Sequence, residues 1–350
     1  MLTEKELNQI KDEIDNCQNP IYLFGDDQDA LCSFLMLYQY KKEGRGIVVK
    51  GNSSINKFFS DKVNEYGADK VFVLDMPKIQ DDFIKNVNVP IIWVDHHGYE
   101  EQLDSKIKYF NPKKHDKNCY IPTSQIVYDA LKTNNPKLKE LMWVAVIGII
   151  GDFAIPTFLE EFCKEYPYLL EKPIKDPGKI KYETELGKLT LMFNFFLKGA
   201  TTNVNQNIKI LTRITDPKEI VEAKTPRAKF LHRHYIKHFK EYEEYLVKAK
   251  GLKPKKNSYV YTYDNPKTSV TKDLANNMSY IYPKKLVIIG RVKNENVILS
   301  LRWNKSMEKI IEEASLNLNV KIGGHPNAMG GTVLYTDWDE FIKRVEKLVN

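Results

Sequence analysis

The chain has 350 residues, of which 42% are hydrophobic and 28% charged, and its formal net charge is +7. Aromatic residues reach 11%, which excludes a globally disordered or low-complexity chain. No apolar run approaches the roughly 18 residues of a membrane span, and the polar N-terminus is unlike a secretory signal. Four scattered cysteines without a CxxC pair exclude a disulfide framework and a zinc knuckle, so we expect a cytoplasmic protein with no membrane partner.

The first 150 residues alternate short apolar runs with helical patterns. Unbroken runs of this kind are typical of strands that are buried on both faces of a parallel sheet. Strands are predicted at 21–24, 46–50, 71–74 and 89–94, and helices at 3–16, 30–42, 56–66, 124–131 and 138–150. The alternation predicts a parallel α/β sheet over this part of the chain.

The rest of the chain is predicted to form a helical segment and then a smaller α/β domain. Residues 165–183 have the composition of a loop, and helices are predicted at 186–197 and 217–250. Strands then follow at 259–264, 286–292, 297–303 and 330–335, with helices at 272–282, 307–318 and 337–349. These elements predict three regions, 1–155, 156–250 and 251–350, with the long helix as the connector.

Acidic and imidazole side chains follow three of the predicted strands. Asp27 and Asp29 follow the first, Asp75 follows the third, and Asp95, His96 and His97 follow the fourth. The carboxyl ends of parallel strands meet at one edge of a sheet, which is where open α/β sheets place their ligands. Asp152 ends the apolar helix at 138–150, where an unpartnered buried charge would be costly.

This arrangement predicts a divalent metal site. Clustered carboxylates raise each other's pKa, and a cation removes the repulsion between them. Carboxylate oxygens with imidazole nitrogens suit Mn²⁺ or Mg²⁺, and two such ions can activate a water for phosphoryl chemistry. A single Asp after a strand is usually a turn residue or a helix cap, so the prediction depends on the whole set.

The same residues resemble the motifs of a known superfamily. Asp27-Gln28-Asp29, Asp75, Asp95-His96-His97 and Asp152 are similar to the four motifs of the DHH phosphoesterases, and GGHPNAMGG at 323–331 resembles the glycine-rich signature of their DHHA1 subfamily. That subfamily contains RecJ-type exonucleases, small oligoribonucleases and cyclic-dinucleotide phosphodiesterases. The resemblance implies a DHH catalytic domain over 1–155 and a DHHA1 substrate-binding domain over 251–350, with the active site in the cleft between them.

The resemblance also implies a role for each motif residue. Two Mn²⁺ or Mg²⁺ ions would be held, with Asp75 bridging them, Asp27 on the first, and Asp29, His96 and Asp152 on the second. His97 would face the substrate phosphate, and Asp95 would orient a histidine. In the C-terminal domain Gly323, Gly324 and His325 would bind a phosphate, and Arg302 would grip the substrate through its guanidinium fork.

Two further motifs have open interpretations. Thr123 and Ser124 precede a predicted helix, and a plain N-cap is the favoured explanation although the family has similar residues nearby. His234 and His238 lie one helical turn apart, and a solvated or interdomain face is favoured over a metal pair. Together with neighbouring Lys and Arg residues, their helix is also a candidate wall of a groove for a nucleic acid backbone.

The favoured hypothesis is a metal-dependent phosphodiesterase or exonuclease acting on short or single-stranded oligonucleotides. The family usually has a His or Asp shortly before the first motif's Asp, where this chain has Leu23, Phe24 and Gly25. This departure favours the alternative, a catalytically weak RecJ-like scaffold with a protein partner in a replication or repair complex. A pyrophosphatase of the same superfamily is a third hypothesis, which the 323–331 motif disfavours.

Overall fold

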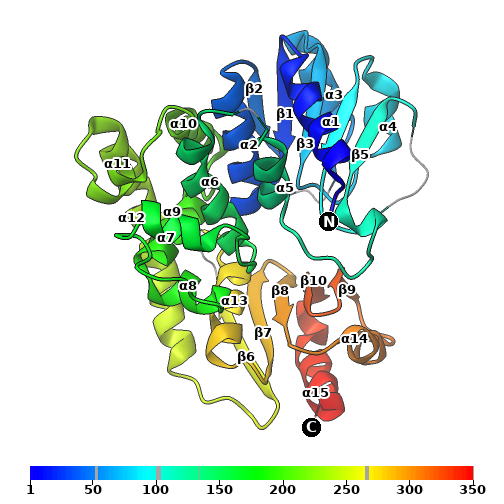
Figure 1. Cartoon of the computed structure of the whole chain (residues 1–350). Coiled ribbons are helices and arrows are strands. Elements are labelled where there is room, and N and C mark those ends of the chain that lie inside the picture. The colour runs from blue at the N-terminus through cyan, green and yellow to red at the C-terminus, as the bar shows by residue number, and fades with distance from the viewer. Residues whose placement is uncertain (52–53, 100–103, 134, 265–267, 350) are drawn as a thin grey trace. The chain divides into compact units, whose positions relative to one another are not determined.

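The computed structural model describes residues 1–51, 54–99, 104–133, 135–264 and 268–349 (Figure 1). The chain divides into two compact units, Met1–His234 and Tyr235–Asn350. Each unit has its own sheet and is described separately. Within the described ranges, no helix has both the length and the apolar character needed to cross a bilayer.

The first unit is built on a five-stranded parallel sheet of order β2-β1-β3-β4-β5. Its strands are β1 (Pro20–Phe24), β2 (Arg45–Val48), β3 (Lys70–Leu74), β4 (Ile91–Val94) and β5 (Ile107–Phe110). The predicted parallel α/β sheet is therefore confirmed. The sequence analysis missed the edge strand β5, whose residues are partly exposed and carry a weaker apolar signal than β1, β3 and β4.

Helices cover both faces of this sheet. On one face, strand side chains such as Leu23, Val73 and Trp93 pack with α3 (Lys57–Tyr66) and α4 (Asp81–Asn86). On the other face, Phe34 of α2 (Gln28–Lys41) stacks on Phe24 with ring centroids 4.6 Å apart. Burial on both faces explains why these strands are continuous apolar runs.

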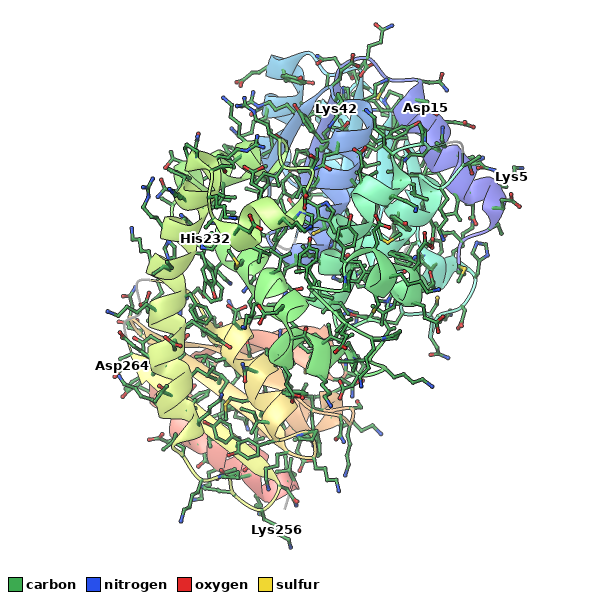
Figure 2. The ribbon with its side chains drawn as sticks, turned by 60° about the vertical axis from the view of Figure 1, so that its left-hand side comes forward. Lys5, Asp15, Lys42, His232, Lys256 and Asp264 are labelled. Carbon is green, nitrogen blue, oxygen red and sulfur yellow. The ribbon has the colours of Figure 1, made fainter. Side chains whose placement is uncertain are left out.

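Three more helices complete this side of the unit: α1 (Glu4–Asp15), α5 (Thr123–Ala130) and α6 (Leu138–Gly151). Helix α1 begins with a capping box, in which Thr3 and Glu6 exchange side-chain and backbone hydrogen bonds. It lies at the surface, with Lys5 and Asp15 near its two ends (Figure 2). Helix α6 is apolar on every side and is almost wholly buried, as its sequence predicts.

The region from 159 to 250 is more helical than predicted. It contains α7 (Leu159–Glu165), α8 (Pro177–Glu183), α9 (Glu185–Phe196), α10 (Thr201–Leu211), α11 (Pro217–Glu222) and α12 (Pro226–Lys250). The predicted loop at 165–183 is wrong at its end, because Asp176 caps α8 and a proline opens it. The predicted single helix at 217–250 is also wrong. The chain turns left-handed at Ala223 (φ 50°), and Pro226 starts a new helix.

His234 and His238 of α12 are buried and bind different groups. The Nε2 of His234 lies 3.0 Å from the Lys198 carbonyl oxygen, and the Nδ1 of His238 lies 2.7 Å from Thr268 Oγ1. Neither joins a group of potential metal ligands within the described residues. The less favoured interpretation of this pair as a metal site is therefore unsupported. Of the favoured interpretation, a solvated or interdomain face, the solvated face is wrong because both side chains are buried, and the interdomain face stays a prediction.

The second unit has a five-stranded mixed sheet of order β6-β7-β8-β10-β9. Its strands are β6 (Ser258–Asp264), β7 (Leu286–Lys293), β8 (Asn296–Arg302), β9 (Val320–His325) and β10 (Ala328–Leu334), and its helices are α13 (Thr271–Ile281), α14 (Glu308–Ser315) and α15 (Trp338–Val349). The glycine-rich segment at 323–331 forms a hairpin. Gly323, Gly324 and His325 end β9 and pair with β10.

Glycine at 148 allows three helices to meet closely. A Cβ at Gly148 of α6 would lie 2.6 Å from Ser124 Oγ of α5 and 2.9 Å from Cys32 Cβ of α2. An alanine in a helix normally stabilises it by about 1 kcal/mol relative to glycine. We expect Gly148→Ala to lower the free energy of unfolding instead, by about 1–3 kcal/mol, because the core is overpacked. Urea unfolding measures this effect. The control is Gly98→Ala, whose added Cβ meets no atom within 4 Å, and equal stability of the two variants would refute the packing argument.

Candidate metal centre

The carboxyl edge of the first sheet collects the acidic and imidazole side chains. Residues 27–29 follow β1, Asp75 follows β3, and residues 95–97 follow β4. Because these three strands are adjacent and parallel, their ends lie side by side. Asp152 arrives from a different element, as the C-cap residue of α6.

Five of these residues form two overlapping groups of potential ligands. Asp75, His96 and His97 make one group, and Asp29, His96 and Asp152 make the other, with the ligand atoms of each group within 4.8 Å of one another. His96 belongs to both. Its Nε2 lies 3.2 Å from Asp75 Oδ1 and 3.5 Å from Asp152 Oδ2.

Asp29 is held by the first turn of α5. Its two carboxylate oxygens accept backbone N–H bonds from Thr123 (2.7 Å) and Ser124 (2.8 Å), and the Ser124 hydroxyl also donates to it. Thr123 Oγ1 lies 3.3 Å from Asp75 Oδ1. The favoured N-cap interpretation of Thr123 and Ser124 is therefore wrong. Pro122 is the N-cap residue, and the first turn of the helix is turned toward the acidic cluster.

Asp75 and the residue that follows Asp152 have left-handed backbone. Asp75 has φ 53° and Phe153, next to Asp152, has φ 56°, both in the left-handed region. The end of α6 is held by Lys181, whose Nζ donates to the Gly151 carbonyl (2.5 Å), and by Tyr120, whose hydroxyl donates to Asp152 Oδ2 (2.6 Å). Lys181 and Tyr120 are supporting residues that the sequence analysis did not identify, because neither lies in a motif.

The electrostatics of the cluster favour a bound cation. Burial raises the pKa of Asp29 well above its ordinary value, and the charges of Asp75 and Asp152 act in the same direction. Burial, with the charge of Asp27, raises the pKa of Asp75 to about 6. Burial would lower the pKa of His96, but its hydrogen bond to Asp75 and the charges of the carboxylates raise it to about 10. The raised pKa values mean that protons bound to these groups reduce the repulsion between the carboxylates, and a divalent cation could replace those protons.

The donor set fits the expected metals. Carboxylate oxygens and imidazole nitrogens without a thiolate are the ligands that Mn²⁺ and Mg²⁺ sites use. His96 directs Nε2 toward the carboxylates, and its buried Nδ1 has no hydrogen-bond partner within the described part of the chain. Because the His96 ring has polar contacts at one nitrogen only among the described residues, a metal ion bound at Nε2 would fix its position.

Asp95 orients His97, as the resemblance implies. The fully buried Asp95 places Oδ1 2.7 Å from His97 Nδ1, and its Oδ2 accepts a bond from the His97 N–H. Tyr109 at the end of β5 donates to Asp95 Oδ2 (3.2 Å), and Asn111 donates to the Tyr109 hydroxyl (2.7 Å) and to the His97 carbonyl (3.2 Å). The sequence analysis did not identify Tyr109 and Asn111 because it did not predict β5.

Asp27 lies beside the cluster and has a structural task. Its carboxylate accepts the Ala30 N–H (3.2 Å) and so caps α2. It is close enough to Asp75 to raise the pKa of that carboxyl, but it joins neither group of ligands within the described residues. The adjacent Asp26 accepts the N–H of Gly51 (3.1 Å).

The four substrate-binding candidates of the second unit lie on neighbouring strands. Arg302 pairs with Ala328, which pairs in turn with His325. Paired residues share a face of the sheet, so Arg302 and His325 emerge on the same face, two strands apart. The guanidinium of Arg302 donates hydrogen bonds to Asn276 Oδ1 (2.7 Å) and to the carbonyl oxygen of the preceding residue, Leu301 (2.7 Å).

The next row on that face, two residues away along each strand, has small side chains only. It consists of Ser300, Gly330 and Gly323, and a Cβ at Gly323 would meet no atom within 4 Å. Gly324 and Gly331, in contrast, are needed by the hairpin. A Cβ there would lie 2.6 Å and 1.9 Å from carbonyl oxygens of the paired strand, and Gly324 has φ 134°.

Asp95 should set the charge of His97 in the metal-free protein. Burial lowers the pKa of His97, but the hydrogen bond to Asp95 outweighs it and the pKa is raised. Asp95→Asn removes that charge, so we expect the pKa of His97 to fall, which means that the imidazole loses its proton at lower pH. An NMR titration of the His97 ring in the presence of a chelator measures this change. Asp104→Asn, an exposed change outside the cluster, is the control, and an unchanged His97 in Asp95→Asn would contradict the assignment.

Comparison with known proteins identifies the two units. The model of the DHH family, N-terminal domain, matches residues 20–149, and that of the DHHA1 domain matches residues 256–350. No curated protein sequence matches the chain. Among solved structures it resembles Thermus thermophilus RecJ in complex with Mn²⁺ (TM-score 0.72, 14% identity, 99% of this chain covered).

Two other structures are similar over nearly the whole chain. An exonuclease RecJ bound to manganese has a TM-score of 0.63 at 14% identity, covering 99% of this chain and 95% of its own. Entamoeba histolytica CDC45 has a TM-score of 0.55 at 9% identity, covering 98% of both chains. The chain spans 55% of the Thermus RecJ chain. At these identities the likeness shows the fold alone. The two matched models show that the chain carries a DHH-family N-terminal domain and a DHHA1 domain.

Proposed function

We propose that the chain is a divalent-metal-dependent phosphodiesterase that hydrolyses short or single-stranded oligonucleotides. The observation that carries this proposal is the double set of ligands around His96, which joins Asp75 and His97 on one side to Asp29 and Asp152 on the other. Members of the DHH superfamily are metal-dependent phosphoesterases, and the similar RecJ structures are titled as complexes with Mn²⁺ or with Mg²⁺. The proposed ions are therefore Mn²⁺ or Mg²⁺, two per site.

The side chains of the first unit divide the work between them. Asp29, Asp75, His96 and Asp152 would hold the two ions, which when bound supply an activated water and charge stabilisation at the phosphorus. His97 is the outermost of the cluster, with 28% of its side chain exposed. Held at Nδ1 by Asp95, whose hydrogen bond raises the pKa of His97, the protonated ring can donate from Nε2 to a phosphate oxygen of the substrate.

The sheet of the second unit has a surface of its own that suits a nucleotide. Beside Arg302 and His325, the same face of its sheet has only small residues on these strands, Ser300, Gly330 and Gly323. The opposite face packs Leu299, Leu301 and Met329 against α15. A guanidinium, an imidazole and bare backbone suit a phosphate and the adjoining nucleotide.

A scaffold function is the second candidate, and one observation favours it. The first motif lacks the expected His or Asp at Leu23–Gly25, and Asp27 caps α2 instead of joining a ligand group within the described residues. The fold is also that of CDC45. In this case the chain would bind a partner in a replication or repair complex, and its metal affinity would be low.

Asp75→Asn should separate these candidates. The amide is isosteric and tolerates the left-handed backbone at 75, so the fold should persist. It removes the proposed bridging charge, and we expect hydrolysis of end-labelled RNA and DNA, from dinucleotides upward in Mn²⁺, to fall at least about 100-fold. Asp82→Asn, on the exposed start of α4, is the control with full activity expected.

Binding of Mn²⁺ gives an independent readout of the same variant. At 100 times its Kd the ion should stabilise the wild type by about 2.7 kcal/mol, seen as a rise in Tm over a chelator-treated sample. Asp75→Asn should lose most of that rise. No rise in Tm and no cleavage in the wild type would support the scaffold, whereas full activity in Asp75→Asn would overturn the metal mechanism.

Gly323 should matter for the substrate and Gly331 for the fold. Gly323→Val fills open space on an exposed edge strand, so we expect unchanged stability but a KM raised on the order of tenfold, about 1.4 kcal/mol. Gly331→Ala would place a Cβ 1.9 Å from the Lys321 carbonyl oxygen and should destabilise the second unit. Thermal unfolding and steady-state kinetics measure both effects, and an unchanged KM in Gly323→Val would exclude this face as the substrate surface.

A further inference from the structure

A groove lies along the free edge of the first sheet. It has a volume of about 840 Å³ and is lined by β2, by Phe34 and Tyr38 of α2, by the start of α3, and by one face of α10. All these elements belong to the first unit. The residues on α10 recur at helical spacing, Thr201, Asn205, Ile208, Lys209 and Thr212, so this helix forms one wall along its length.

The edge of β2 presents backbone groups to this groove. Val49 donates its N–H to the Phe24 carbonyl of β1, and in a parallel pair alternate residues bond to the same neighbour. Ile47 and Arg45 therefore also face β1, whereas Gly46 and Val48 direct their N–H and C=O groups outward. Within the described part of the chain no hydrogen bond satisfies these outward groups.

The burial of Val48 makes the open edge costly. Val48 is only 5% exposed, and buried backbone groups are nearly always paired. A glycine at 46 is required, because a Cβ would lie 2.4 Å from the Phe34 ring. The ring thus forms an apolar floor beneath a strand edge with two unpaired residues.

The charge of the lining selects the occupant. Four lining residues are basic, Arg45, Lys50, Lys62 and Lys209, and none is acidic. Phe58, at the rim, is 61% exposed and carries the Lys62 ammonium over its ring (4.5 Å). A second copy of this chain would bring its own basic edge and be repelled.

We propose that this groove binds an acidic, extended peptide segment of a partner protein, which adds a strand beside β2. The outward groups of Gly46 and Val48 would pair with its backbone, and its apolar side chains would contact Phe34 and Phe58. Its carboxylates would meet the basic lining. In such strand addition the backbone bonds give affinity and the side-chain sites give specificity. The site is separate from the metal cluster and does not rest on the proposed function.

The test uses random twelve-residue peptides displayed on phage and selected on the full-length protein. We expect peptides in which acidic residues alternate with apolar or β-branched ones. A fluorescein-labelled peptide from that selection is then titrated by fluorescence anisotropy. Val48→Pro removes the outward N–H without breaking a bond to β1, and should weaken binding at least tenfold. Val48→Ala keeps the N–H and should bind within about threefold of the wild type.

The charges are tested with a matched pair of double variants. Lys62→Glu with Lys209→Glu should weaken binding at least tenfold, while Lys5→Glu with Lys179→Glu, the same change in net charge outside the groove, should not. As a check independent of the folding of Val48→Pro, the bound peptide should slow hydrogen exchange of the wild-type amides at 46 and 48.

Three results would overturn the proposal. One is a selection that yields no peptide dependent on the groove. Another is a selected peptide that does not protect the amides at 46 and 48. The third is binding of a labelled dT12 strand that the Lys62 and Lys209 changes abolish and Val48→Pro leaves intact, which would assign the groove to single-stranded nucleic acid.

Discussion

The structure of the first unit depends on how it tolerates three carboxylates at one end of a buried sheet. Asp29, Asp75 and Asp152 are brought together by elements far apart in the sequence, and burial makes their mutual repulsion strong. Hydrogen-bond donors around the three carboxylates offset that repulsion. The first turn of α5 gives backbone N–H groups to Asp29, the His96 imidazole lies between Asp75 and Asp152, and Tyr120 donates to Asp152. A divalent cation held by these side chains would offset the repulsion that remains.

The helices around the cluster are packed to hold it. Gly148 lets α6 approach Ser124 and Cys32, and Ser124 in turn binds Asp29, so a close helix contact fixes the position of a carboxylate. On the far side of the sheet edge, Asn111 and Tyr109 restrain Asp95, which restrains His97. The side chains at the centre therefore have few alternative positions, which is what pre-organised catalysis or tight metal binding needs.

The sequence was sufficient to predict most strands and the gathering of acidic and imidazole side chains at one sheet edge, for a physical reason. Strands buried on both faces must be apolar, and acidic residues at their carboxyl ends stand out against them. What it could not show depends on contacts between distant residues. The role of Thr123 and Ser124 became visible only when α5 was placed beside Asp29. Strands β5 and β9 are edge strands whose exposed residues carry no apolar pattern. Helix α8 is short and depends on its Asp176 cap, whereas α10 has no side-chain cap and depends on the packing of its buried residues.

The left-handed backbone at Asp75 has a consequence for how this family can change over time. At φ 53° glycine, asparagine and aspartate are the residues accommodated at the lowest cost. A lineage that abandoned the chemistry but kept the fold would therefore drift toward asparagine or glycine at this position. The β-branched residues would be disfavoured by the backbone alone. The residue at this position in a relative therefore depends on two constraints, the chemistry of the carboxylate and the backbone of the turn that follows β3.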